Sequence, residues 1–182
     1  MSKVYVFLAD GTEEVEALTV IDLLRRAKVE VVTVSVMDRK HIISSHNISI
    51  VADEVFGALD YMDGDMVVLP GGMPGTINLR EHDELRDVLF SYQEAGKYLA
   101  AICAAPTVFG CNGMLQGKNA VCYPGFEEEL TGATVLNQGV VTDGQFITSK
   151  GLGTAIDFSL ELIRLLVSEE CAGQIAKAIQ YK

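Results

Sequence analysis

Short apolar runs rich in β-branched residues alternate along this chain with longer segments whose apolar residues recur at helical spacing. The first run, residues 4–9 (VYVFLA), leads through a turn into a helical segment over 15–27. A second run at 29–36 follows after that single helix. This order predicts a parallel β-α-β unit with a right-handed crossover, and hence a doubly wound α/β fold.

The same alternation continues through the rest of the chain. The pattern predicts further strands at 66–69, 98–102, 120–123, 140–141 and 146–148, and helices at 81–95, from 104, at 153–167 and at 169–182. Between 37 and 58, two alternating runs around 45–47 predict a hairpin at the sheet edge. No linker or repeat interrupts the series. We therefore expect residues 1–182 to form one domain, a mostly parallel sheet flanked by helices in a flavodoxin-like α/β sandwich.

Charge and cysteine content narrow the class of protein. The 25 acidic residues outnumber the 14 Lys and Arg residues, giving a formal net charge of −11, so binding to nucleic acid or an anionic membrane is not expected. The run at 4–9 is too short for a signal segment or a membrane span, so a soluble, cytoplasmic protein is expected. The four cysteines have no C-x-x-C spacing, which favours reduced thiols over a zinc site or a disulfide framework.

One of these thiols, Cys103, directly follows the predicted strand 98–102, and Pro106 suits the first turn of the next helix. In an open parallel sheet, ligands bind at the carboxyl ends of the strands. A helix N-terminus stabilises a thiolate, so a lowered pKa is predicted for Cys103. The alternative is that Cys103 is a small buried hydrophobe, which is common for a cysteine among Ala and Ile.

Two other loops follow predicted strands with unusual residues. Residues 70–75 (PGGMPG) contain consecutive glycines, which let backbone amides approach a ligand or simply turn the chain. Residues 10–16 (DGTEEVE) are acidic, which also suits the first turn of any helix. Neither loop identifies a site by itself.

Taken together, the segments DGTEEVEA, VVLPGG, AAICAAPT and SKGLGTAIDF resemble the DJ-one branch of the ThiJ/PfpI superfamily, relatives of glutamine amidotransferase domains, from Lys3 to Val167. The resemblance implies that Cys103 lies in a strained nucleophile-elbow turn. It implies that Glu16 hydrogen-bonds the cysteine and that Glu13 also faces the pocket. Because a charged carboxylate would oppose a thiolate, we predict a raised pKa and a protonated state for Glu16.

The resemblance also supplies the rest of the predicted pocket. Gly72 and Ala104 would provide backbone N–H groups for an oxyanion, with Gly71, Tyr123 and Pro124 beside them. Many superfamily members have a histidine where this chain has Tyr123, so chemistry that needs a Cys-His-acid triad is not expected. The remaining cysteines Cys111 and Cys171 are expected to be structural, and Cys122 to be a strand residue packed in the core.

Two functions remain open at this point. The first is a glyoxalase or deglycase, in which Cys103 adds to an α-oxoaldehyde or to its early adduct with a thiol or amine, while Glu16, or alternatively Glu13, moves the proton. The second is a redox sensor or chaperone, in which peroxide oxidises Cys103 to sulfinic acid. The thiazole-biosynthesis label attached to ThiJ-like sequences finds no matching site here. No cofactor or metal is implied, and relatives suggest a homodimer through Val15, Leu18 and Val20 of the first helix.

Overall fold

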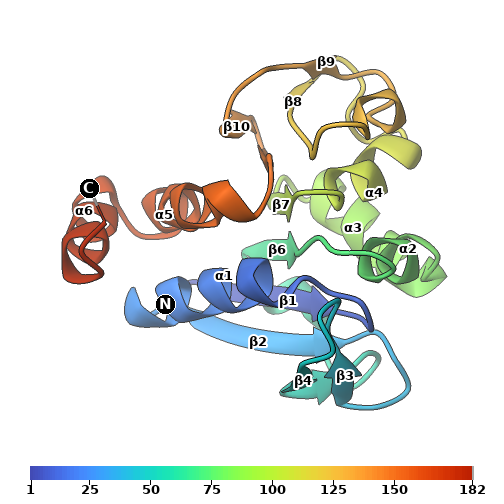
Figure 1. Cartoon of the computed structure of the whole chain (residues 1–182), viewed down its shortest axis with the longest axis horizontal. Coiled ribbons are helices and arrows are strands. Elements are labelled where there is room, and N and C mark those ends of the chain that lie inside the picture. Colours follow the sequence, from blue (N-terminus) through green and yellow to red (C-terminus); the bar gives the residue numbers. More distant parts are fainter. Residues whose placement is uncertain (182) are drawn as a thin grey trace.

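A seven-stranded sheet forms the centre of the computed structural model, which describes residues 1–181 (Figure 1). Its order is β10-β11-β7-β6-β1-β2-β5, and every neighbouring pair is parallel except β10 with β11. The strands are β1 Lys3–Leu8, β2 Glu30–Ser35, β5 Glu54–Val55, β6 Met66–Leu69, β7 Tyr98–Ile102, β10 Val140–Asp143 and β11 Phe146–Ser149. The predicted doubly wound, mostly parallel α/β fold is confirmed.

Helices cover both faces of this sheet. On one face α1, α5 and α6 share a hydrophobic core with the sheet, and on the other α2, α3 and α4 do so. Figure 1 shows α5 and α6 side by side at the C-terminal end of the chain. The helices are α1 Glu14–Arg26, α2 Gly75–Arg80, α3 Asp83–Glu94, α4 Pro106–Cys111, α5 Ala155–Leu166 and α6 Glu169–Ala178.

The central strand β1 explains why the apolar runs are continuous rather than alternating. Val4 and Val6 belong to the core beneath α1 and α5, whereas Tyr5 and Phe7 belong to the core on the opposite face. All four side chains are fully buried. A strand covered on both faces needs apolar residues at every position, which is typical of parallel sheets.

Two small sheets lie outside the central one. The predicted hairpin forms as β3 His41–Ile43 and β4 Ser49–Val51, but it is a separate two-stranded sheet, and the edge of the main sheet is β5. The predicted strand at 120–123 is reduced to β8 Asn119–Ala120, which pairs with β9 Thr134–Val135. The prediction was wrong for Tyr123, which lies in the loop after β8.

Short 3-10 turns complete the described chain, as η1 Tyr61–Asp63, η2 Glu127–Glu129 and η3 Leu152–Thr154. Among residues 1–181, none of the helices has the length and apolar character needed to cross a membrane. The helix expected at 169–182 forms as α6 and ends at Ala178. Residue 182 lies outside the described residues.

Candidate active site

The turn between β7 and α4 places Cys103 in a backbone conformation that L-residues rarely adopt, with φ of 66°. Two hydrogen bonds hold this turn. The Cys103 N–H donates to the Ser149 carbonyl at 2.9 Å, and the Tyr123 N–H donates to the Cys103 carbonyl at 2.7 Å. Neighbouring structure therefore imposes a strained conformation on a residue with a nucleophilic side chain, and such strain clusters at functional turns. The thiol is partly exposed.

Glu16 comes to the same place from the first turn of α1. Its side chain is almost fully buried, with a relative exposure of 1%. Oε2 accepts the Gly71 N–H at 3.0 Å, and the carboxyl is a hydrogen-bond partner of the Cys103 thiol. Glu13 caps the helix, since its Oε2 accepts the Glu16 N–H at 2.7 Å. The cap fixes the turn from which Glu16 points at the sulfur.

The two glycines after β6 permit this close approach. A Cβ atom on Gly71 would lie 2.5 Å from the Cys103 Cβ and 2.6 Å from Oε2 of Glu16. Gly72 has a φ of +94°, and a Cβ there would lie 2.3 Å from the Glu13 nitrogen. Side chains are excluded at both positions, so backbone N–H groups come within reach of the sulfur.

Glu16 and Cys103 influence each other's protonation. Burial raises the pKa of Glu16 to about 7, and the charge of Glu13 also raises it, although the Cys103 hydrogen bond acts in the opposite direction. The predicted raised pKa of Glu16 is therefore confirmed. The predicted lowering of the Cys103 pKa is wrong, because burial and the adjacent Glu16 carboxylate raise the thiol pKa to about 12, despite the Ala104 and Gly72 N–H groups.

Both pKa values are raised, because Glu16 and Cys103 titrate as a coupled pair and not as two independent groups. When Glu16 is charged, it keeps Cys103 protonated. When the proton moves to Glu16, the repulsion disappears and the Glu16 carboxyl can donate a hydrogen bond to the thiolate. The N–H groups of Gly72 and Ala104 then remain as donors to the sulfur. The arrangement can generate a thiolate by moving a proton within the pair.

A pocket of about 280 Å³ opens beside the thiol, between the 123–124 segment and the 150–154 loop. A Cβ on Gly151 would lie 3.9 Å from Sγ of Cys103 and 3.3 Å from the Tyr123 ring, which places this wall next to the sulfur. Pro124 and Leu152 complete the same lining. The predicted pocket residues Tyr123 and Pro124 thus line a pocket whose wall at Gly151 lies next to the thiol.

The structure brings most of the predicted site residues together. Cys103, Glu16, Gly71, Gly72 and Ala104 are in mutual contact. Glu13 contacts Glu16 through its backbone N–H rather than the sulfur. The 151–154 segment, which the family resemblance places at a helix cap near the pocket or the dimer interface, lies against the cysteine in the structure.

Three expectations for other side chains have clear outcomes. Cys122 is buried in the core as predicted, with a relative exposure of 3%, but it lies after β8 and not in a strand. Cys111 is exposed beside Arg80 and Glu129. Val20 of α1 is fully buried, because the helix turns this residue toward the sheet. Val20 therefore cannot form part of a dimer surface. Cys171 is partly buried against the α5 and α6 core.

The assembled groups can perform two kinds of chemistry. A thiolate formed at Cys103 can add to an electrophilic carbon, with N–H groups close by for the oxygen that becomes negative. A buried carboxyl that exchanges its proton near pH 7 can act as an acid and as a base. Among the described residues, Glu13, Glu14 and His46 bring three potential metal-ligand atoms within 4.8 Å of one another.

Known proteins resemble this chain along most of its length. The model of the DJ-1/PfpI family matches residues 2–165. Protein DJ-1 homolog B of Arabidopsis thaliana is 38% identical over 176 residues, covering 96% of this chain but only 40% of the Arabidopsis protein. The chain therefore spans less than half the length of that relative.

Two further proteins are informative. The solved structure of oxidized DJ-1 from Toxoplasma gondii superposes with a TM-score of 0.96 at 37% identity, covering 100% of this chain and 99% of that one. A Caenorhabditis elegans protein named glutathione-independent glyoxalase DJR-1.2 is 27% identical over 172 residues, covering 93% of this chain and 91% of that protein. Sequence and architecture agree along nearly the whole chain.

Proposed function

Since this chain belongs to the DJ-1/PfpI family, we propose that it is a cofactor-independent enzyme that converts small α-oxoaldehydes, such as methylglyoxal, to hydroxy acids. The observation that carries the proposal is the contact between the strained Cys103 and the buried Glu16, whose pKa is raised to about 7. The glyoxalase name of the nematode relative is consistent with it.

The proposed reaction begins with proton transfer from Cys103 to Glu16. The thiolate then adds to the aldehyde carbon, and a C–S bond forms as the carbonyl π bond breaks. The resulting oxyanion lies near the N–H groups of Gly72 and Ala104, which contact the sulfur. Glu16 gives its proton to that oxygen, which forms a hemithioacetal and leaves Glu16 charged.

Charged Glu16 then removes the proton from the former aldehyde carbon, and the electron pair of that C–H bond forms a C=C bond to the neighbouring carbon as its carbonyl π bond breaks. Glu16 returns the proton to the neighbouring carbon, while the hydroxyl proton of the first carbon moves to the oxygen of the second. The first carbon is oxidised to a thioester and the second is reduced to an alcohol, so no external oxidant or reductant is needed. Water cleaves the thioester, which releases the hydroxy acid and restores the Cys103 thiol. Early adducts of the same aldehydes with thiols or amines are the second substrate class in this proposal, acted on as by a deglycase.

The pocket is suited to a substrate of this size and charge. Its wall beside the thiol is formed by Tyr123, Pro124 and Leu152, with no acidic side chain among the residues that line it. Glu13 and Glu16 lie at the start of α1, and the Glu16 carboxyl hydrogen-bonds the thiol. A small neutral aldehyde meets no repulsion from these carboxylates, whereas an anionic substrate would.

A redox function of the same cysteine is the second candidate. The partly exposed thiol lies beside two N–H donors and a carboxyl that holds a proton below about pH 7. Those donors would equally stabilise the oxygens of a sulfinic acid formed by peroxide. This function needs stoichiometric oxidation and no turnover.

Purified wild-type protein and its Cys103→Ser variant would be incubated with methylglyoxal, and lactate formation measured against enzyme concentration. The proposal expects many equivalents of lactate from wild type and none from the variant. Peroxide titration followed by intact mass would run in parallel. If wild type forms no lactate while Cys103 alone gains two oxygen atoms, the enzyme proposal is overturned and the redox function replaces it.

A further inference from the structure

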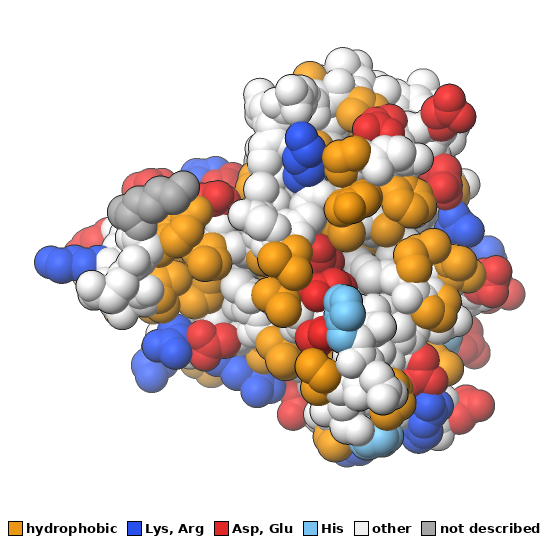
Figure 2. Space-filling model, viewed as in Figure 1, with side chains coloured by type: hydrophobic (Ala, Val, Ile, Leu, Met, Phe, Trp, Pro, Cys, Tyr) orange, Lys and Arg blue, Asp and Glu red, His pale blue; other side chains and the backbone are white. Residues whose placement is uncertain are grey.

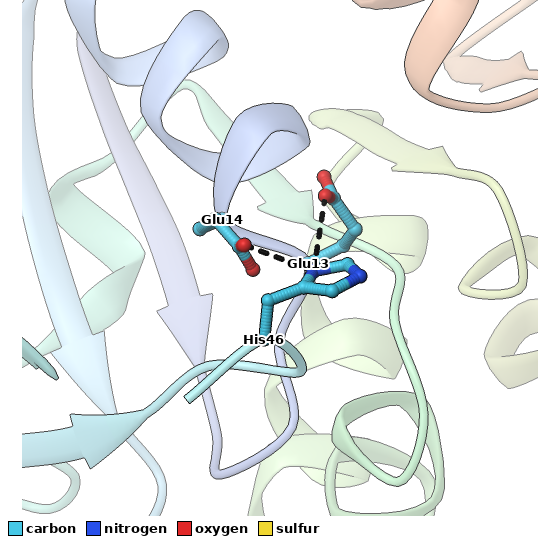
Figure 3. A group of neighbouring side chains, drawn as sticks. All are labelled: Glu13, Glu14 and His46. Carbon is cyan, nitrogen blue, oxygen red and sulfur yellow. Dashed lines mark ion pairs between the residues drawn. The ribbon is translucent and has the colours of Figure 1, made fainter. Parts of the chain in front are cut away.

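The turn of the β3–β4 hairpin brings His46 to the start of α1, next to two consecutive glutamates (Figure 3). Nδ1 of His46 lies 2.9 Å from Oε1 of Glu14 and 3.9 Å from Oε1 of Glu13. One ligand atom from each of the three residues falls within 4.8 Å of the others. Figure 2 shows a histidine beside acidic side chains near the middle of the face that it draws.

Each glutamate uses its other oxygen for a contact that orients it. Oε2 of Glu13 accepts the Glu16 N–H at 2.7 Å, and Oε2 of Glu14 accepts the Ser45 hydroxyl at 3.3 Å. The two Oε1 atoms are left to face the same imidazole nitrogen. Hydrogen bonds to the distal atoms of ligating side chains are the usual way in which proteins fix the orientation of metal ligands.

The charge of this group is not balanced by other side chains. The side chains of Glu13 and Glu14 retain only 12% and 9% of their exposure. Within residues 1–181, neither carboxylate has a lysine or arginine nitrogen within ion-pair distance, and His46 is the partner of both. A neutral imidazole supplies a lone pair but no positive charge. A bound cation would place positive charge beside two largely buried carboxylates.

We propose that Glu13, Glu14 and His46 form a binding site for a divalent transition-metal ion, with zinc as the best match. Zinc binds imidazole nitrogen and carboxylate oxygen at about 2.0–2.2 Å in a tetrahedron, which puts neighbouring ligand atoms about 3.4 Å apart. The observed separations of 2.9 and 3.9 Å lie on either side of that value. An imidazole ligand disfavours calcium and magnesium, which prefer oxygen alone. The fourth position is open to water.

Bound zinc would join two parts of the fold. The hairpin is a sheet of its own and is tied to the loop before α1 by backbone hydrogen bonds, including Ser45 N–H to the Thr12 carbonyl at 2.9 Å and Gly11 N–H to the Ile43 carbonyl at 2.7 Å. A metal held by His46 and both glutamates adds a direct link to the helix that carries Glu16. The site rests on its own geometry and does not depend on the proposed reaction.

Zinc alone would be titrated into the metal-free full-length chain by isothermal calorimetry. We expect one equivalent to bind wild type, the same affinity for His41→Ala, and an affinity at least about tenfold lower for His46→Ala. His41 lies on the same hairpin and is exposed, so it is the matched control. Zinc should also raise the unfolding temperature of wild type and of His41→Ala more than that of His46→Ala.

Two further variants distinguish zinc binding at this group from zinc binding at the Cys103 thiol. Cys103→Ser should bind zinc as wild type does, and Glu14→Gln should bind it as weakly as His46→Ala while keeping a native circular dichroism spectrum. The proposal is overturned if His46→Ala binds zinc as tightly as wild type, if binding is lost in Cys103→Ser, or if wild type shows no saturable one-to-one binding. The last result would leave the group as a histidine–glutamate ion pair only.

Discussion

A buried carboxyl such as Glu16 is unusual, because burial without a cationic partner opposes its charged form. The side chain has an exposure of 1% and makes its contacts with Cys103 and a backbone N–H. An apolar residue of the same shape would fill this space without that penalty. We infer that Glu16 is retained for its proton, which it can exchange with the adjacent thiol.

This arrangement predicts how stability depends on pH. The pKa of Glu16 rises from 4.5 to about 7 on folding, so between these values the native state binds more protons than the unfolded state and stability falls as pH rises. Glu16→Gln removes the effect. From pH 4.5 to above pH 7, the variant should gain about 3 kcal/mol in unfolding free energy relative to wild type, measured by urea unfolding in buffer containing EDTA. Parallel stability curves for the two proteins would contradict this.

At the scale of the elements, the site depends on how closely three segments approach one another. The loop after β6, the first turn of α1 and the β7–α4 turn meet at Gly71, where a Cβ would lie 2.5 Å from Cys103 and 2.6 Å from Glu16. Backbone from each segment surrounds the sulfur. The position of the loop, rather than any side chain on it, therefore sets the geometry of the site.

Substituting Gly71→Ala should displace this loop. We expect a loss of about 1–3 kcal/mol in unfolding free energy, the usual cost of forcing a methyl group into a packed region, together with loss of methylglyoxal turnover. Gly173→Ala is the control, since a Cβ at Gly173 meets nothing within 4 Å and the residue lies within α6. Wild-type stability and turnover in Gly71→Ala would show that the loop after β6 has room for a methyl group beside Cys103 and Glu16.

The elements that could be predicted from sequence are those with long, strong patterns. The β1–α1–β2 unit and the strands at 66–69 and 98–102 were located to within a residue or two, because their apolar runs are buried on both faces. The two-residue strand β5 and the six-residue helix α2 were missed, since such short elements have no recognisable period.

The candidate site was predicted from short motifs. The prediction fails for properties that depend on residues outside those motifs. They placed Cys103 and Glu16 correctly beside each other but not the direction of the thiol pKa, which depends on burial in three dimensions. The contact of His46 with Glu13 and Glu14 is set by the hairpin, which folds back from a distant part of the chain. No local pattern carries that information.

At the scale of the whole molecule, we propose that two chains associate through α1. Val15 and Leu18 are 44% and 46% exposed there, and Leu152 is 50% exposed at η3. The Leu152 backbone interacts with the Glu16 carboxyl, so these apolar side chains lie around the candidate site. An exposed group of this kind commonly marks an interface. An interface at this position would place the second chain next to the pocket.

Leu18→Asp should therefore convert a dimer into a monomer, because it places a charge in the apolar interface. Light scattering after size-exclusion chromatography would measure the molar mass of wild type, Leu18→Asp and the control Val51→Asp, whose residue is 69% exposed on β4. We expect dimers for wild type and the control. A monomeric wild type, or a dimeric Leu18→Asp, would refute the proposed interface.

In the proposed reaction, Cys103 bonds to the aldehyde and Glu16 moves the proton that follows. Rapid mixing of wild type and Glu16→Gln with methylglyoxal, quenched in acid and read by intact and peptide mass, tests both parts. We predict that Glu16→Gln forms lactate at least about a hundredfold more slowly than wild type, and that any substrate bonded to either protein is on Cys103. A substrate adduct on another residue, or equal lactate formation by the two proteins, would contradict this mechanism.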